Sequence, residues 1–479
     1  MRMRVPAALA ALMAVALVLG VTWTAVTPPF QAPDEQSHFA YTQFLAERFE
    51  LPGEPARQIY SSEHIRAASA VNADQVAGQP LTPPEWSDTG YRRWQGLTRA
   101  DAPDDGGGNH SASTYPPASY GWQSIGYRLA SGGDFFDKLS GARLFSVLWL
   151  PITVLATWLL AGELFGRRRL PQLAAASVPA LAPMLAFVSG SVSPDGMLYA
   201  LWTVALWLGV RCLRHGLRAR GAAAFFAVVG LACVTKPVSY ALLPGALLVL
   251  AVGLWRLRPS SFGAMARRAG AAAVALALTL GAWIVLARAL DRPAAAQVAG
   301  ATASAATDWR ELLSYVWQYY LPRTPAQTDA VGPDIGYRAF RVWIVQGWGA
   351  FGWLEIRFAD NVYRVLAILT AGVGAAALAS AWRARRRLDL AVVAFLALVA
   401  ISLLAGLHWS DYRALKAGGG GFMQARYLFP LIGLMGCALA AAAHLVPARA
   451  RAAAVGATVA GLLVFHLFSL GLVLQRFYA

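Results

Sequence analysis

Residues 28–39 read Pro28-Pro29-Phe30-Gln31-Ala32-Pro33-Asp34-Glu35-Gln36-Ser37-His38-Phe39 and directly follow the first long apolar run of the chain. Proline suits the first position of a helix, and acids are favoured in the first turn, where they face the positive end of the helix dipole. A helix that begins here would place Asp34, Glu35 and His38 near one face. Two interpretations follow: a well-capped helix at a membrane interface, or an acidic functional site at the mouth of a membrane span.

The composition indicates a membrane protein. Of the 479 residues, 57% are hydrophobic and only 14% are charged, whereas about 25% of the residues of a soluble domain are charged. Apolar runs of about 20 residues, long enough to cross a hydrocarbon core as helices, recur from end to end. The sequence therefore predicts an all-α polytopic membrane protein with a single transmembrane domain over residues 1–479.

The net charge of +16 does not indicate nucleic-acid binding. The arginines form short clusters between apolar runs, which is the positive-inside pattern of membrane proteins and not a binding stripe. Cys212, Cys233 and Cys437 fall in or at the ends of apolar runs without metal-ligand spacing. They give no support to a disulfide framework.

About eleven spans are predicted. The first follows Met1-Arg2-Met3-Arg4 and resembles a secretory signal, but it is longer than a usual signal core and lacks a small-x-small cleavage site, so we interpret it as a retained span. The predicted spans are 5–26, 139–161, 170–190, 196–213, 220–235, 237–255, 269–290, 362–382, 388–407, 426–446 and 453–474.

The arginine clusters assign an orientation. They alternate consistently onto one side of the predicted spans, which should be cytoplasmic together with the N-terminus. The clusters are Arg2/Arg4, 167–169, 211–220, 256–268, 383–387 and Arg449/Arg451. The opposite, external side then receives three long segments, 27–138, 291–361 and 408–425. The second contains an aromatic stretch, 308–320, which predicts a helix lying in the plane of the membrane interface.

Two acids lie on the predicted external side, each beside a span. Asp34 sits where a dry cavity at membrane level would raise its pKa, which suits a general base for a hydroxyl group. Asp195 follows Ser193-Pro194 in a turn between two spans, and a helix cap explains it equally well. Two acids delivered to one membrane face favour a shared acidic pocket.

Several cations break the positive-inside bias. Lys236 lies in a predicted external turn, where it would either bind a phosphate or extend to lipid headgroups. Arg426 opens a span from the external side, and Arg323 and Arg143 are further candidates. Such cations near acids at the membrane surface suit a substrate with a phosphate group, which arginine binds bidentately and lysine as a point charge.

Several short motifs follow one another along the chain. They are Pro29-Phe30-Gln31-Ala32-Pro33-Asp34-Glu35-Gln36-Ser37-His38-Phe39, Tyr115-Pro116-Pro117, Ala142-Arg143-Leu144, Ser193-Pro194-Asp195, Lys236, Phe351-Gly352-Trp353 and Gln424-Ala425-Arg426-Tyr427. In this order the motifs resemble GT-C superfamily glycosyltransferases, and more closely a bacterial branch of predicted polytopic membrane proteins of unassigned function. The branch often has Gly where this chain has Ala425, and Asn where it has Ser193.

The resemblance implies a GT-C-like bundle in a bacterial cytoplasmic membrane, with its active site on the external face. It implies transfer of a sugar from a polyprenyl-phosphate donor to a cell-envelope glycan or lipid acceptor. Asp34, oriented by Glu35 and His38, would be the base, and Asp195 would assist. The implied substrate- and phosphate-binding residues are Lys236, Arg426, Arg323, Tyr115 and Arg143.

Three questions stay open on the sequence. Some members of the superfamily use a divalent metal and others do not, so Asp34, Glu35, His38 and Asp195 are also candidate metal ligands. A transporter or flippase of lipid-linked saccharides would use the same acids and cations, and a broken span would favour it. A non-catalytic scaffold of envelope assembly would need the acids only as helix caps.

Overall fold

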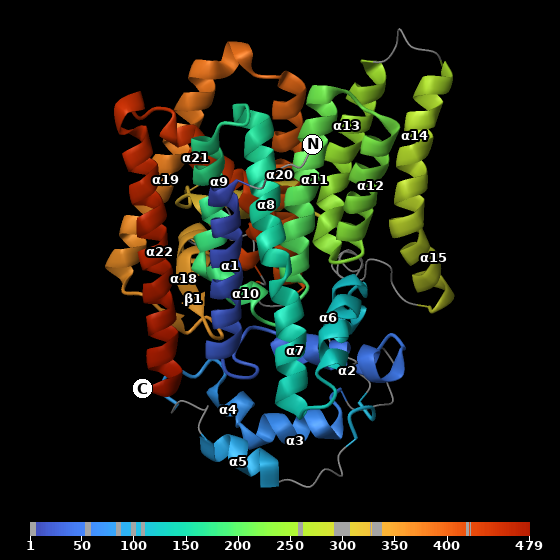
Figure 1. The fold of residues 1–479 in the computed structure, drawn as a ribbon, viewed down its shortest axis with the longest axis vertical. Coiled ribbons are helices and arrows are strands. Elements are labelled where there is room, and N and C mark those ends of the chain that lie inside the picture. Colours follow the sequence, from blue (N-terminus) through green and yellow to red (C-terminus); the bar gives the residue numbers. More distant parts are fainter. Residues whose placement is uncertain are drawn as a thin grey trace.

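The computed structural model describes residues 6–52, 59–82, 88–96, 102–106, 111–256, 262–291, 307–325, 327, 338–417, 421 and 423–479. The spanning helices stand side by side, and the short helices α2 to α5 lie together at one end of the bundle (Figure 1). The only strands within the described residues form one two-stranded hairpin. The predicted all-α polytopic architecture is confirmed.

The apolar part of the chain forms long helices, several of which continue through a short 3-10 or π-helical segment. They are α1 (Ala7–Val26), α7 (Phe135–Val147), α8 (Trp149–Phe165), α9 (Arg169–Leu181), α10 (Pro183–Ser189), α11 (Asp195–His215), α12 (Ala219–Cys233), η2 (Pro237–Leu242), α13 (Leu243–Trp255), α14 (Phe262–Leu276), η3 (Ala277–Gly281), α15 (Ala282–Ala289), α19 (Asp360–Ala384), η6 (Arg385–Arg387), α20 (Leu390–Lys416), η7 (Ala425–Leu431), α21 (Ile432–Ala443) and α22 (Ala448–Tyr478).

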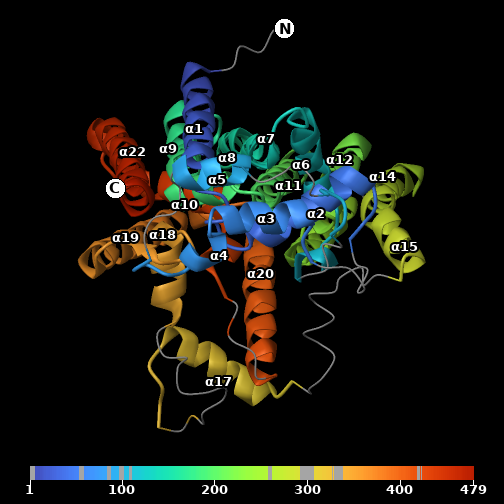
Figure 2. The same cartoon turned by 90° about the horizontal axis from the view of Figure 1, so that it is seen from below.

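The polar segments between them form shorter elements. These are α2 (Glu35–Arg48), α3 (Ser62–Ala70), α4 (Ala73–Val76), α5 (Asp88–Gly96), η1 (Ser111–Thr114), α6 (Ala118–Leu129), α17 (Trp309–Tyr320), η5 (Phe340–Gln346), α18 (Gly347–Gly349), β1 (Ala350–Phe351) and β2 (Ile356–Arg357). The helix predicted around 308–320 is present as α17. Figure 2 shows it projecting from the bundle beside the end of α20.

The number of spans differs from the predicted eleven. Nine helices among the described residues are long and apolar enough to cross a membrane, or ten if the bent pair α9–α10 counts as one span. The span predicted at 220–235 corresponds to α12, which has only 15 residues. It ends at Cys233 because the following Thr235-Lys236-Pro237 turn leads into the interior of the molecule, where Lys236 is buried.

The central helix of the bundle is α11. Its apolar stretch is 78% buried, more than that of any other of the nine spans, whereas that of α19 is 6% buried. Asp195 is the first residue of α11. A side chain at this position therefore lies at one end of the most enclosed helix.

The chain bends shortly before it reaches Asp195. The axes of α9 and α10 differ by 53°, and Pro183 at the start of α10 explains the break because proline cannot continue the helical hydrogen bonds. The imidazole of His466 contacts the Leu181 carbonyl oxygen at 3.0 Å through Nδ1, and Trp23 Nε1 donates to His466 Nε2 at 2.8 Å. The bend is thus fixed by α22 and α1.

Two contacts fix the positions of segments at the end of the bundle where α2 to α5 lie. A Cβ atom on Gly126 of α6 would lie 2.2 Å from the Gly141 carbonyl oxygen of α7, so only glycine permits this helix crossing. The helix α6 also packs against α2. Trp353, in the turn between β1 and β2, donates from Nε1 to the Phe30 carbonyl oxygen at 3.0 Å and so joins segment 291–361 to segment 27–138.

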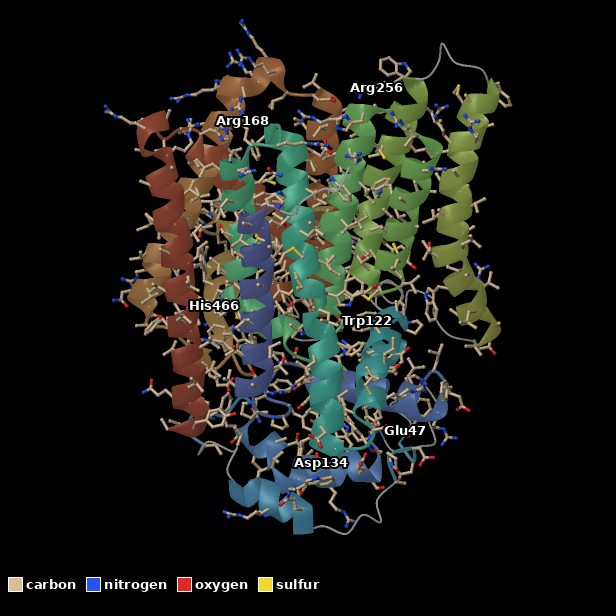
Figure 3. All side chains as sticks on the ribbon, in the orientation of Figure 1. Glu47, Trp122, Asp134, Arg168, Arg256 and His466 are labelled. Atoms are coloured by element: carbon tan, nitrogen blue, oxygen red, sulfur yellow. The ribbon has the colours of Figure 1, made fainter. Side chains whose placement is uncertain are left out.

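The ends of the bundle differ in charge. Arg168 and Arg256 lie at the end opposite to Glu47 and Asp134 (Figure 3). This separation agrees with the arginine pattern of the sequence. The assignment of the arginine end to the cytoplasm remains a prediction.

Candidate functional site

Asp34 does not cap the helix that it precedes. It is the residue before α2, with a left-handed backbone (φ +62°), and its side chain makes no capping hydrogen bond. The carboxylate instead forms an ion pair with Arg426, 392 positions away in the sequence. A non-glycine residue held in this conformation without local use of its side chain is typical of functional sites. The capping interpretation is therefore wrong for Asp34.

Asp195 and Lys236 form a second ion pair. Lys236 Nζ donates to Asp195 Oδ1 at 2.6 Å, and both side chains are buried. Lys236 therefore does not extend to lipid headgroups. Asp195 retains part of the predicted cap, since its backbone N–H contacts Ser193 Oγ at 3.3 Å, but its carboxylate points to the lysine.

Arg426 joins the two pairs. Its Nη1 lies 3.8 Å from Asp195 Oδ2, while its Nη2 contacts Asp34. Four segments that are far apart in the sequence thus supply a line of alternating charges, Asp34, Arg426, Asp195 and Lys236, which we call the charged cluster. The sequence-based prediction named all four residues, but not their pairing.

Aromatic rings surround the charged cluster. Lys236 Nζ lies 4.9 Å from the ring centre of Tyr427 and 5.8 Å from that of Tyr115. The ring of Tyr427 also lies 5.4 Å from the guanidinium carbon of Arg426. Such cation–π contacts stabilise a buried positive charge without neutralising it. Tyr115 was a predicted site residue, whereas Tyr427 was only part of the Gln424-Ala425-Arg426-Tyr427 motif.

His38 belongs to the wall of the cluster. Its Nδ1 lies 2.8 Å from Tyr120 Oη, and its ring stacks on those of Tyr115 and Tyr120. Its side chain is therefore oriented by Tyr120 and does not hydrogen-bond the Asp34 carboxylate. Tyr120 was missed as a site residue, although its place in Tyr115-Pro116-Pro117-Ala118-Ser119-Tyr120 was a usable signal.

The charges shift the ionisation of the groups outside the spans. Burial would raise the pKa of the Asp34 carboxyl, but Arg426, together with His38 and Lys236, outweighs burial and lowers this pKa below its ordinary value. This corrects the raised pKa expected from the sequence. Burial lowers the pKa of His38 to about 3, so this histidine is neutral at physiological pH. Burial opposes the charge on Lys236, but Asp195, together with Tyr115 and Tyr427, more than offsets burial and raises the lysine's pKa.

Two buried atoms of the charged cluster lack a hydrogen-bond partner within the part of the chain that the structure describes. They are Asp195 Oδ2, an acceptor, and Arg426 Nε, a donor. Leaving such atoms unpaired costs on the order of 1–3 kcal/mol each. One acceptor and one cationic donor in the same cluster match a ligand that carries both a hydroxyl group and an anionic oxygen.

Glu35 and Arg143 lie outside the charged cluster. Arg143 Nε donates to Glu35 Oε1 at 2.7 Å, and both side chains are buried. The backbone N–H groups of Phe30 and Val192 also donate to this carboxylate. Glu35 therefore cannot orient Asp34, because both its oxygens are bound elsewhere.

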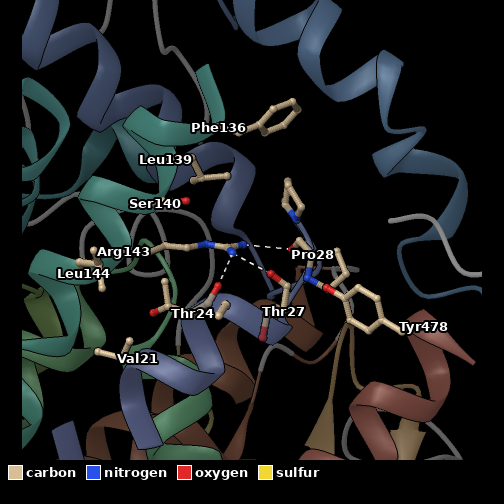
Figure 4. A pocket seen from close by; sticks show the side chains of 12 residues that line it. Val21, Thr24, Thr27, Pro28, Phe136, Leu139, Ser140, Arg143, Leu144 and Tyr478 are labelled. Carbon is tan, nitrogen blue, oxygen red and sulfur yellow. Dashed lines mark hydrogen bonds between the residues drawn. The ribbon is translucent and has the colours of Figure 1, made fainter. Parts of the chain in front are cut away.

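Arg143 is likewise fully used. Its remaining N–H groups donate to the carbonyl oxygens of Thr24, Thr27 and Pro28 at 2.7–3.2 Å. It lines a cavity of about 350 Å³ between α1, α7 and Tyr478 of α22 (Figure 4). Because its donors are occupied, we assign it the role of joining the end of α1 to the start of α2.

Arg323 also lies elsewhere. It follows α17, is exposed, and donates from Nη2 to the Gln327 carbonyl oxygen at 2.8 Å. The structure therefore does not bring it to the charged cluster. In the sequence, Arg323 differed from Lys236 and Arg426 only in lying farther from a predicted span.

The four candidate metal ligands do not fit a metal ion. Within the described residues, no group of three or more His, Cys, Asp or Glu side chains has a metal-binding arrangement. Glu35 is bound to Arg143, His38 contacts Tyr120, and Arg426 lies between Asp34 and Asp195. A divalent cation bound between the two carboxylates would have to displace this arginine.

Comparison with solved structures finds likenesses at low identity. The apo oligosaccharyltransferase of Archaeoglobus fulgidus is 15% identical, with a TM-score of 0.48, over 98% of this chain and 56% of that one. ArnT from Cupriavidus metallidurans bound to undecaprenyl phosphate is 15% identical, with a TM-score of 0.49, over 98% of this chain and 71% of that one. This chain thus spans little more than half the length of the archaeal enzyme. TM-scores below 0.5 support no statement about the site.

Comparison by sequence gives a clearer result. No curated protein matches the chain. One family model matches residues 17–435, which include every member of the charged cluster. By this match the chain belongs to the DUF2142 family of predicted membrane proteins.

Proposed function

We propose that this protein is a membrane glycosyltransferase, which moves a sugar from a polyprenyl-phosphate donor to a cell-envelope glycan or lipid acceptor at the external face of a bacterial cytoplasmic membrane. The observation that carries the proposal is the charged cluster. Two buried cations and two carboxylates from four distant segments meet, and within the described residues two atoms of this cluster, Asp195 Oδ2 and Arg426 Nε, have no hydrogen-bond partner. The motif resemblance to the GT-C superfamily supplies the reaction class.

The cations suit the phosphate of such a donor. Arg426 presents a planar fork that matches two phosphate oxygens, and Lys236 adds a point charge. Both are largely buried, so their attraction for an anion is screened less than that of surface lysines. Asp195 Oδ2, which has no hydrogen-bond partner among the described residues, accepts a hydrogen bond from a hydroxyl group of the sugar.

The reaction follows from these positions. The acceptor oxygen forms a bond to the anomeric carbon of the sugar as the bond between that carbon and the phosphate oxygen breaks. The acceptor's proton passes to Asp34, the one carboxylate of the cluster that is half exposed. The bonding electron pair leaves with polyprenyl phosphate, and Lys236 and Arg426 stabilise its added negative charge.

A transporter or flippase of lipid-linked saccharides is the second candidate. The bent pair α9–α10, which directly precedes the Ser189–Asp195 turn, is the kind of interrupted span found in transporters. A transporter would use the charged cluster to bind the phosphate without breaking a bond. Sugar transfer measured in detergent distinguishes the two functions. No membrane separates two compartments there, so only an enzyme shows activity.

The test is transfer by the purified full chain in detergent. Radiolabelled polyprenyl-phosphate sugars are offered together with an extract of envelope acceptors, and labelled acceptor is measured. We expect transfer by the wild type and a loss of at least a hundredfold in Asp34→Asn, since positioned bases contribute about 10²–10⁴-fold. Asp134→Asn, at a cap of α7 where Asn serves equally well, is the matched control and should keep full activity. Equal transfer by both variants would contradict the assignment.

A further inference from the structure

The group assigned as the base is bound to the group assigned to the phosphate. Asp34 Oδ2 forms an ion pair with Arg426 Nη2. A carboxylate that neutralises an arginine cannot at the same time take a proton efficiently, and the arginine cannot fully engage a phosphate. The pairing therefore describes the cluster before its substrate binds.

We propose that the phosphate of the donor displaces Asp34 from Arg426, so that donor binding itself frees the base. This inference rests on the proposed function and concerns the order of events at the same site. It predicts that the donor binds before the acceptor's proton is taken, and that a protein without donor holds Asp34 in an unreactive state.

Arg426 is the fixed partner of the pair. Its side chain is only 7% exposed. Its backbone is held by Tyr199, whose hydroxyl donates to the Arg426 carbonyl oxygen at 3.0 Å, and Ala425 N–H donates to Gln346 Oε1 at 3.2 Å. An arginine held in this way cannot follow a carboxylate that turns away.

Asp34 is the partner that can move. Its side chain is 47% exposed. It makes no capping hydrogen bond to α2, so turning it toward solvent breaks no contact of the helix. The ion pair with Arg426 is the contact that is lost on turning, and an incoming phosphate replaces that contact for the arginine.

The exchange is favourable for the arginine. Among the residues that the structure describes, Arg426 Nε has no hydrogen-bond partner while Asp34 contacts Nη2. A phosphate oxygen pair can occupy Nε and an Nη nitrogen together, which satisfies the free donor as well as the one that Asp34 leaves. Asp195 remains paired with Lys236 throughout.

The exchange also changes the basicity of Asp34. Burial raises the pKa of its carboxyl, whereas Arg426, the strongest of the neighbouring groups that act in the opposite direction, contributes to a net lowering of this pKa. Loss of the arginine removes that effect and raises the pKa, which makes the carboxylate a better proton acceptor. Binding and activation are therefore coupled through one side chain.

The experiment is a double-mutant cycle of binding that needs no turnover. Purified full chain in detergent is titrated with polyprenyl monophosphate, and Kd is measured for the wild type, Asp34→Asn, Arg426→Lys and the double variant. If Asp34 competes with phosphate for the guanidinium, Asp34→Asn should bind roughly tenfold more tightly than wild type. In the Arg426→Lys background, which keeps the charge but loses the fork, the same change should gain less than about twofold.

Each other outcome overturns a stated part of the account. An equal gain in both backgrounds would mean that Asp34 acts only by its charge, and no gain would mean that it does not compete. Either result ends the inference and leaves the proposed function standing. Failure of the wild type to bind polyprenyl monophosphate would end both. Asp134→Asn serves as the control and should bind as the wild type does.

Discussion

Asp34 and Glu35 are adjacent in the chain but lie in different environments. Glu35 is fully buried, and Arg143 and two backbone N–H groups occupy its oxygens. Asp34 is half exposed, and its side chain is paired only with Arg426 among the described contacts. The same chemical group is therefore a structural link at one position and a reactive group at the next.

The first prediction separates these two roles. Glu35→Gln leaves Arg143 buried without its counter-charge, which should lower the free energy of unfolding by about 3–5 kcal/mol. Asp34→Asn should change it by less than about 1 kcal/mol, because the exposed side chain loses one ion pair. Thermal unfolding of both variants in the same detergent measures the difference. Equal destabilisation would contradict the assignment of Glu35 to structure.

His38 predicts a dependence of stability on pH. Its pKa is about 3 in the folded protein, against about 6.5 in the unfolded chain. Between these values the unfolded state binds more protons, so stability is full above pH 6.5 and falls as the pH decreases. The loss from this residue should reach about 2 kcal/mol at pH 5.

The measurement is unfolding of the wild type and His38→Gln between pH 7.5 and 5. Glutamine can still contact Tyr120 Oη but does not titrate. The variant should therefore show a shallower loss of stability with acid than the wild type does. Parallel curves would mean that the pKa of His38 does not differ between the folded and the unfolded protein.

At the level of elements, α17 is connected to the segment that carries Arg426. Tyr315 Oη donates to Asp411 Oδ2 of α20 at 2.6 Å, and Asp411 Oδ1 accepts from Met423 N–H at 3.2 Å. The sequence between α20 and Met423 is rich in glycine, the residue that restricts the backbone least. Contacts such as these hold the segment 423–427 in place.

The prediction concerns that connection. Tyr315→Phe removes one donor from the buried Asp411 and should increase hydrogen exchange of backbone amides in 423–431 roughly tenfold. Glu311→Gln, which weakens the contacts of Glu311 with Lys416 and Tyr412 between the same two helices but leaves the Tyr315–Asp411 hydrogen bond in place, is the control and should leave this exchange unchanged. Exchange that stays equal in Tyr315→Phe and the wild type would mean that α17 does not hold this segment.

The sequence predicted the elements better than their contacts. Apolar runs located the spans because length and hydropathy are local properties, although α12 proved shorter than a span. The polar exceptions, Lys236 and Arg426, identified the cluster because each breaks a general charge bias. The pairing of Glu35 with Arg143 was not predictable, because Glu35 is adjacent to Asp34 in the same motif and only the folded chain gives the two acids different partners.

At the level of the whole molecule, the account requires that the charged cluster face outward. Leu81 is 97% exposed and follows α4 in the predicted external segment 27–138, whereas the exposed Arg386 lies in an arginine cluster. The described cysteines, Cys212, Cys233 and Cys437, are buried. In intact bacterial cells, a membrane-impermeant maleimide should label Leu81→Cys at once and Arg386→Cys only after permeabilisation. The reverse pattern would invert the proposed topology.

The most direct measurement is an electron cryo-microscopy structure of the full chain with bound polyprenyl monophosphate. The account predicts a phosphate between Lys236 and Arg426, within hydrogen-bond distance of Arg426 Nε, and an Asp34 side chain turned away from the arginine. A phosphate at the Arg143 cavity or beside Arg323, with the pair of Asp34 and Arg426 intact, would contradict it.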